Sequence, residues 1–141
     1  MNRELILRVA KFRDALEKFS KSTGYIGLDN FPHGACADSS LLLAKYLKES
    51  GIYRFCFITG KFFDLQGEIC THAWLEKNDL VVDITSDQFS EISNPVFIIQ
   101  KNAWYEKFEI ENHGEITYED FDSYTKGSLA NCYNLIASKI N

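Results

Sequence analysis

The spacing of apolar residues changes twice along the chain. In the N-terminal segment Leu5, Val9, Phe12 and Leu16 recur at helical spacing between charged residues, which is typical of an amphipathic helix packed on a core. The same spacing returns near positions 43–47 and again near the C-terminus. Helices are therefore predicted over residues 3–20, 36–48 and about 128–140.

Between the second and the last helix, apolar and polar residues alternate, which is the period of a strand. The alternation predicts strands over residues 53–59, 70–76, 80–84 and 95–99, with a weaker one over 107–110. Helices at both ends and a run of strands between them predict an α+β fold. N-terminal helices then pack on an antiparallel β-sheet, and a C-terminal helix completes the fold. With no repeat or linker in the pattern, we expect a single domain over residues 1–141.

The composition and charge of the chain argue against several classes of function. The 141 residues carry a formal net charge of −5 and no run of Lys or Arg, which argues against a nucleic-acid or anionic-membrane partner. No segment approaches the roughly 20 apolar residues needed to span a bilayer, and the N-terminus does not resemble a signal peptide. The expected location is the cytoplasm, where the four cysteines would be reduced thiols.

Three residues in separate elements suggest a thiol nucleophile. Cys36 follows a Gly34-Ala35 turn at the predicted start of a helix, and His72 lies on a predicted strand. Asp83 lies on the next strand, in the apolar run Leu80–Ile84, where a buried carboxylate needs a partner. A hairpin centred on the Lys77–Asn78 bond would place His72 opposite Asp83, with Cβ atoms roughly 4.5–5.5 Å apart. A loop of two or four residues gives this register.

The start of a helix also favours the thiolate. The free N–H groups of the first turn lower the pKa of a thiol there and can bind an oxyanion. Cys56 alternates with aromatic residues in a strand, and Cys132 lies on the apolar face of the last helix, so both are expected in the core. Cys70 shares a strand face with His72 and either flanks the site or packs beneath the helix that begins at Cys36.

Two other interpretations fit the same residues. His33, Cys36, Cys70 and His72 provide the donor types of a structural zinc site, but their spacings differ from those of the usual zinc motifs. The chain could instead be a non-catalytic binding domain, with Cys36 buried under an aromatic loop such as Phe62-Phe63. The segment 104–124, rich in Glu and aromatic residues, fits either a specificity pocket or a partner surface.

The stretches Gly34-Ala35-Cys36-Ala37-Asp38-Ser39-Ser40, His72-Ala73-Trp74-Leu75-Glu76 and Val82-Asp83-Ile84-Thr85 resemble the transglutaminase-like branch of the papain-like cysteine enzymes. The chain is also similar to small bacterial proteins of unassigned function in which Asp-Gln-Phe, here Asp87-Gln88-Phe89, follows the Asp strand. The likeness covers about residues 30–90.

The resemblance implies a papain-like, transglutaminase-like fold with Cys36 as nucleophile, His72 as general base and acid, and Asp83 orienting His72. The implied enzyme acts on an amide or related acyl group of a peptide, protein or small molecule through a thioester, with no metal or other cofactor. Hydrolysis, as in a peptidase or deamidase, is the default, and acyl transfer to an amine is the alternative.

The resemblance also implies an oxyanion or substrate-binding group near the nucleophile. The candidates are Asn30, six residues before Cys36, His33 in the same loop, and Trp74, two residues after His72. Asp87 and Gln88 are interpreted as structural residues of the loop that follows Asp83.

Overall fold

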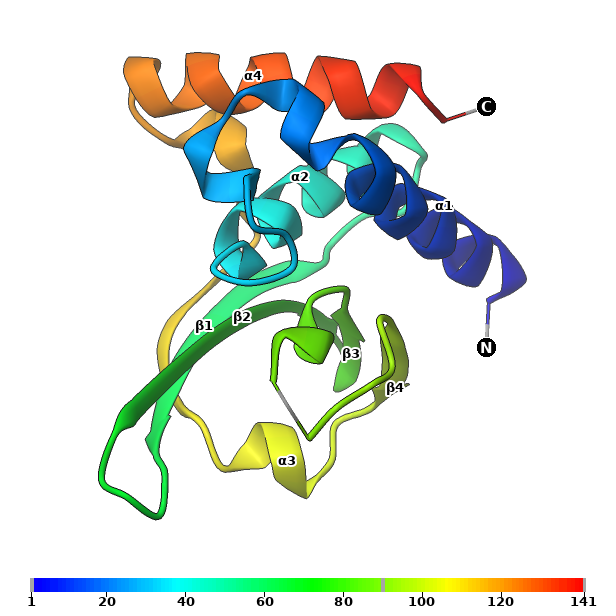
Figure 1. Cartoon of the computed structure of the whole chain (residues 1–141). Coiled ribbons are helices and arrows are strands. Elements are labelled where there is room, and N and C mark those ends of the chain that lie inside the picture. The colour runs from blue at the N-terminus through cyan, green and yellow to red at the C-terminus, as the bar shows by residue number, and fades with distance from the viewer. Residues whose placement is uncertain (1, 90, 141) are drawn as a thin grey trace.

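The computed structural model describes residues 2–89 and 91–140 and has the predicted α+β class. A five-stranded antiparallel sheet in the order β4-β3-β2-β1-β5 carries three long helices at one side (Figure 1). The elements run in the order α1 (Arg3–Phe19), α2 (Cys36–Glu49), β1 (Cys56–Phe63), β2 (Ile69–Lys77), β3 (Leu80–Asp83), β4 (Phe97–Gln100), α3 (Ala103–Glu106), β5 (Glu109–Gly114) and α4 (Ser123–Ser138).

The helical layer forms where the sequence pattern predicts it. The side chain of Asn2 caps α1 by accepting from the backbone N–H groups of Glu4 and Leu5. The apolar stripe of α1, including Phe12 and Leu16, is fully buried against α2, α4 and the sheet. Burial of this stripe, more than local propensity, holds the long helices on the sheet.

The two faces of the sheet are covered by different layers. Ala73 and Leu75 of β2 face the main core under the long helices, whereas Trp74 belongs to a second cluster with Tyr105 and Phe108. The short helix α3, which the sequence did not predict, supplies Tyr105 and covers this second face (Figure 1). Its start is capped by the side chain of Asn102.

The predicted register of the β2–β3 hairpin is wrong by two residues. Leu75 pairs with Val82 and Lys77 with Leu80, so the hairpin turns at Asn78-Asp79 instead of Lys77-Asn78. Both turn residues have positive φ, 50° and 64°, which is the conformation of a tight two-residue hairpin turn. Because side chains alternate with a period of two, a shift by two leaves His72 and Asp83 on one face.

Several other boundaries differ from the prediction, among them those of β1, which ends at Phe63, of β5 and of α4. β1 begins at Cys56, since Arg54 has a φ of 72° that interrupts the extended backbone before it. β5 spans Glu109–Gly114, beyond the predicted strand at 107–110. α4 begins at Ser123, five residues early, because the side chain of Asp122 accepts from Thr125 N–H and caps the helix there.

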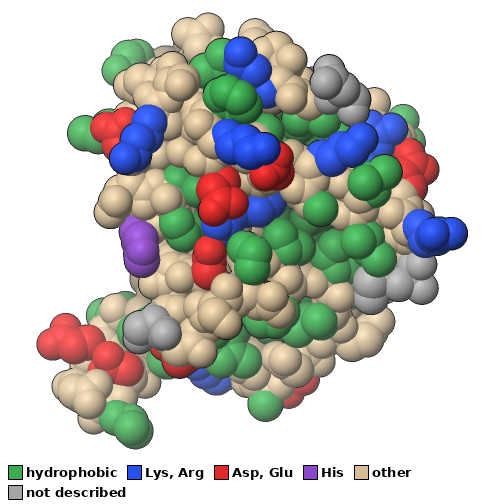
Figure 2. All heavy atoms as spheres, turned by 45° about the vertical axis from the view of Figure 1, so that its right-hand side comes forward, with side chains coloured by type: hydrophobic (Ala, Val, Ile, Leu, Met, Phe, Trp, Pro, Cys, Tyr) green, Lys and Arg blue, Asp and Glu red, His purple; other side chains and the backbone are tan. Residues whose placement is uncertain are grey.

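The β1–β2 hairpin extends past the body of the molecule (Figures 1 and 2). Near its end Phe63, Leu65 and Ile69 are largely exposed. β3 pairs with β2 only at Leu75–Lys77, so the half of β2 that carries His72 lies beyond the paired region. Within the described residues, no helix is long and apolar enough to cross a membrane.

Candidate active site

Cys36 is the first residue of α2 and is partly buried. Ala35 occupies the N-cap position and has no side chain that could accept from the first turn, so no side-chain cap occupies these N–H groups. Gly34, with a φ of 69°, provides the left-handed turn that leads into the helix. The helix start thus presents the sulfur to the part of β2 that β3 does not cover.

His72 and Asp83 form a fully buried pair. His72 Nε2 lies 2.7 Å from Asp83 Oδ2, and both side chains are about 1% exposed. The contact exists although the two residues are not directly opposed, because a diagonal neighbour on the same face is still within reach of a long side chain. The three predicted residues Cys36, His72 and Asp83 are therefore brought together, because Cys36 lies close enough to His72 for the imidazole to favour its thiolate.

Two further donors hold the Asp83 carboxylate. Tyr105 donates its phenol O–H to Oδ2 at 2.8 Å, and the backbone N–H of Thr85 donates to Oδ1 at 3.0 Å. Burial and the negative charge of Asp83 raise the pKa of Tyr105 well above its usual range, so the phenol keeps its proton and remains a donor. A buried carboxylate with three donors is fixed in place and presents one oxygen to His72.

The pKa values of Cys36 and His72 are shifted in opposite directions, and each shift favours the charged form of its group. Burial disfavours a charged imidazole, but the charge and hydrogen bond of Asp83 outweigh it and raise the pKa of His72 to about 9. Burial likewise opposes ionisation of the Cys36 thiol, but hydrogen bonds to His72 and the imidazolium charge lower its pKa. Both shifts favour a thiolate–imidazolium pair near neutral pH.

Gln88, which the sequence interpretation treated as a structural loop residue, lies in the site. It ends a single 3₁₀ turn, Ser86–Gln88, and its Nε2 lies 3.0 Å from His72 Nδ1. Its amide also lies close enough to Cys36 to help to lower the pKa of that thiol. Gln88 thus contacts both members of the thiol–imidazole pair.

A buried ion pair holds the turn that carries Gln88. Arg13 of α1 binds Asp87 through two parallel contacts of 2.9 Å and also donates to the carbonyl oxygens of Ile84 and Pro95. Its guanidinium carbon lies 4.6 Å from the ring centre of Phe31. Asp87 is structural, as the sequence interpretation proposed, and Arg13 is a charged residue of α1 that is buried.

Aromatic rings surround the imidazole. Trp74, Phe89, Trp104 and Phe108 have ring centres 5.1–6.2 Å from that of His72. They come from β2, from the segment after Asp83 and from the region of α3. This apolar surrounding lowers the local dielectric and strengthens the interactions between the charged groups of the site.

The three candidates for an oxyanion-binding group do not fill that role. Asn30 and His33 are exposed in the loop before α2, where the backbone N–H of His33 donates to the Asn30 carbonyl, and no side-chain contact joins either to the site. Trp74 is completely buried, and its indole N–H donates to Glu76 at 2.9 Å, so that donor is occupied.

The other cysteines are not part of the pair. Cys132 is buried in the main core, as expected, whereas Cys56 is only partly buried at the start of β1. Cys70 is partly buried, with its sulfur 4.0 Å from Asp64 Oδ2. Within the described part of the chain, no three His, Cys, Asp or Glu side chains are grouped as metal ligands, so the zinc interpretation gains no support from the geometry.

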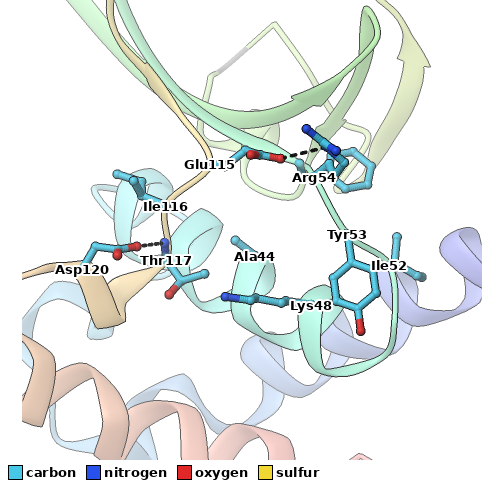
Figure 3. Close-up of a pocket in the computed structure, with 10 residues that line it drawn as sticks. Ala44, Lys48, Ile52, Tyr53, Arg54, Glu115, Ile116, Thr117 and Asp120 are labelled. Atoms are coloured by element: carbon cyan, nitrogen blue, oxygen red, sulfur yellow. Dashed lines mark hydrogen bonds and ion pairs between the residues drawn. The ribbon is translucent and has the colours of Figure 1, made fainter.

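The burial of Cys36 under Phe62-Phe63, which the binding-domain interpretation expected, is also not observed. Phe62 packs edge-on against Phe108, and Phe63 is exposed. A separate pocket of about 470 Å³ lies between α2, the start of β1 and residues 115–120 (Figure 3). Arg54 pairs with Glu115 there, and Asp120 accepts from the backbone N–H of Thr117, so much of its polar lining is already partnered.

Tyr105 was not predicted as a site residue, and Gln88 was given only a structural role, because both come from segments without a regular hydrophobic period. The signal available for Gln88 was its place in Asp87-Gln88-Phe89, soon after the Asp83 strand, whereas nothing in the pattern indicated Tyr105. Comparison of the chain with known protein families, with curated proteins and with solved structures finds no match.

Proposed function

We propose that this protein is a cysteine-nucleophile hydrolase that acts on an amide or related acyl group, with Cys36, His72 and Asp83 as a catalytic triad. The observation that carries the proposal is the arrangement around His72. Nε2 is held by Asp83 at 2.7 Å, which leaves Nδ1 as the nitrogen for the thiol of Cys36. The nucleophile Cys36, the base His72 and the orienting group Asp83 then lie next to one another in that order. This is the geometry that acyl transfer by a thiol requires.

In the first half of the reaction, the Cys36 sulfur attacks the carbonyl carbon and His72 holds the thiol proton. The tetrahedral intermediate collapses with cleavage of the C–N bond, and His72 gives its proton to the leaving amine. In the second half, water attacks the thioester carbon while His72 takes a proton from the water. The thiolate leaves, the acid is released, and Asp83 stabilises the imidazolium throughout.

The helix-start cysteine, the antiparallel sheet and the order Cys, His, Asp along the chain support a papain-like, transglutaminase-like arrangement as part of this proposal. Such a site can also transfer the acyl group to an amine in place of water. Water is the simpler acceptor because it needs no second binding site, so hydrolysis is the form we propose.

The test is the pH dependence of iodoacetamide alkylation at Cys36, followed by mass spectrometry in the wild type and in His72→Ala. We expect Cys36 to react well below the ordinary thiol pKa of about 8.5, and His72→Ala to lose this reactivity. Cys56 provides an internal comparison, because burial and nearby carboxylates raise the pKa of its thiol.

A wild-type Cys36 that reacts no faster than an ordinary thiol, unchanged by His72→Ala, would argue for a non-catalytic binding domain. If Cys36 is activated, product analysis with a library of acyl amides, with and without added primary amine, separates hydrolysis from transfer. Cys36→Ala must then abolish turnover with little change in the free energy of unfolding.

A further inference from the structure

Gln88 has a position that a purely structural loop residue does not need. Its amide nitrogen lies 3.0 Å from Nδ1 of His72, and the same amide is near enough to Cys36 to favour the thiolate. The side chain is only partly buried. An amide with two N–H groups thus borders the atoms between which a proton moves in the proposed reaction.

The contact with Nδ1 depends on the protonation state of His72. When Nε2 donates its proton to Asp83, neutral Nδ1 has a lone pair that accepts from the Gln88 amide. Once Nδ1 takes the proton of Cys36, this lone pair is gone and the amide N–H loses its acceptor. The nearest acceptors are then the sulfur and any atom bonded to it.

In the tetrahedral intermediate, the new negative charge is on the oxygen of the carbon bonded to Cys36 Sγ. That oxygen is two bonds from the sulfur, within the range of a side chain that contacts His72 Nδ1 beside Cys36. Among the described residues, the other side-chain candidates are less suitable: Trp74 donates its N–H to Glu76, and Asn30 and His33 are exposed in the loop before α2.

The segment carrying Gln88 is rigid enough to place a donor. Asp87, its chain neighbour, is held by the two-pronged contact from buried Arg13, which also binds the carbonyl oxygens of Ile84 and Pro95. An oxyanion donor is effective when it is fixed before the reaction and does not have to be reorganised during it. Arg13 and Asp87 act on Gln88 as positioning residues.

We propose that Gln88 is a catalytic residue that donates an amide N–H to the oxyanion of the tetrahedral intermediate, a role open to its amide whenever Nδ1 of His72 carries a proton, as in the thiolate–imidazolium pair. This inference rests on the proposed function, since it needs a reaction at Cys36 that forms an oxyanion. The helix-start N–H groups at Cys36 are a complementary source of donors.

The test compares two reactions of Cys36 in Gln88→Ala. Acylation by p-nitrophenyl acetate proceeds through an oxyanion, whereas alkylation by iodoacetamide is a direct displacement without one. Both adducts are measured on the Cys36 peptide by mass spectrometry at several pH values. We expect Gln88→Ala to slow acylation by about 100-fold while alkylation stays within about threefold of the wild type.

Gln88→Glu keeps the size but lacks an N–H donor in its ionised form and should also lose acylation. Gln66→Ala, which removes an exposed glutamine at the end of the hairpin, should change neither rate. Equal losses in both reactions would overturn the oxyanion role and assign Gln88 to the ionisation of the pair. No loss in either, or no acylation of wild-type Cys36, would also overturn it. An unreactive Cys36 toward iodoacetamide would instead refute the proposed function.

Discussion

Asp83 shows how a single residue can set the chemistry of its neighbours. It is fully buried, and its two oxygens accept from His72, Tyr105 and the backbone of Thr85. Removing one partner of a buried charged pair is more costly than losing an exposed pair, because the remaining group keeps its desolvation penalty. The negative charge of Asp83 therefore affects the pH at which His72 loses its proton.

Asp83→Asn removes the charge that raises the pKa of His72 to about 9, so the imidazolium should be lost at lower pH. Without the cationic partner, the pKa of Cys36 should increase. We expect the inflection in the alkylation rate of Cys36 to move upward by about one pH unit or more, equivalent to about 1.4 kcal/mol.

Alkylation rates from pH 4 to pH 10 measure this shift. Asp14→Asn on the exposed face of α1 is the matched control and should leave the inflection where it is in the wild type. An unchanged inflection in Asp83→Asn would show that the carboxylate does not control the pair.

At the level of elements, the β2–β3 hairpin explains why the site could be predicted despite an incorrect turn. The side chains of a strand alternate strictly, so any even shift in register keeps His72 and Asp83 on the same face. Their distance then depends on a diagonal contact instead of a direct cross-strand pair. Periodicity identified the face, and the φ values of Asn78 and Asp79 determined the register.

Asp79 adopts a φ of 64° in the second position of the turn, a conformation that glycine adopts at less cost. We expect Asp79→Gly to increase the free energy of unfolding by about 0.5–1 kcal/mol, since Asn-Gly is the preferred pair in this turn. Urea denaturation followed by circular dichroism measures the change.

Asp79→Ala is the control, because it removes the same carboxylate without the conformational freedom of glycine. It should be less stable than Asp79→Gly by about 1 kcal/mol. Equal stability of the two variants would mean that the turn conformation is not the source of the effect.

For the whole molecule, the site lies at the edge between two separate apolar layers. Cys36 comes from a helix of the main core, whereas His72 shares the opposite face of β2 with Trp74 and faces the cluster under α3. Cys36 and His72 meet where β3 no longer pairs with β2. The proposed catalytic groups from both layers are thus brought together at this edge.

Truncation of one side chain in each layer should separate stability from reactivity. Leu16→Ala in the main core should cost about 2–5 kcal/mol of unfolding free energy and leave the alkylation rate of Cys36 unchanged in the folded protein. Phe108→Ala should cost about 3–5 kcal/mol and also reduce that rate severalfold, since its ring lies 6.2 Å from His72.

Denaturation curves and alkylation rates at pH 7, taken well below the unfolding midpoint, provide both measurements. An equal effect of the two truncations on the rate would indicate that reactivity follows global stability and not the aromatic surroundings of the imidazole.

Local pattern alone identified the long helices, the antiparallel strands, Cys36 at a helix start, and the common face of His72 and Asp83. These features depend on periods of 3.6 and 2 and on helix-start geometry, which neighbouring residues determine. Tertiary structure decided the burial of Arg13, the hydrogen bond from Tyr105 and the position of Gln88. Each depends on contacts between residues more than fifteen positions apart, so the energy that places them comes from packing that no local pattern contains.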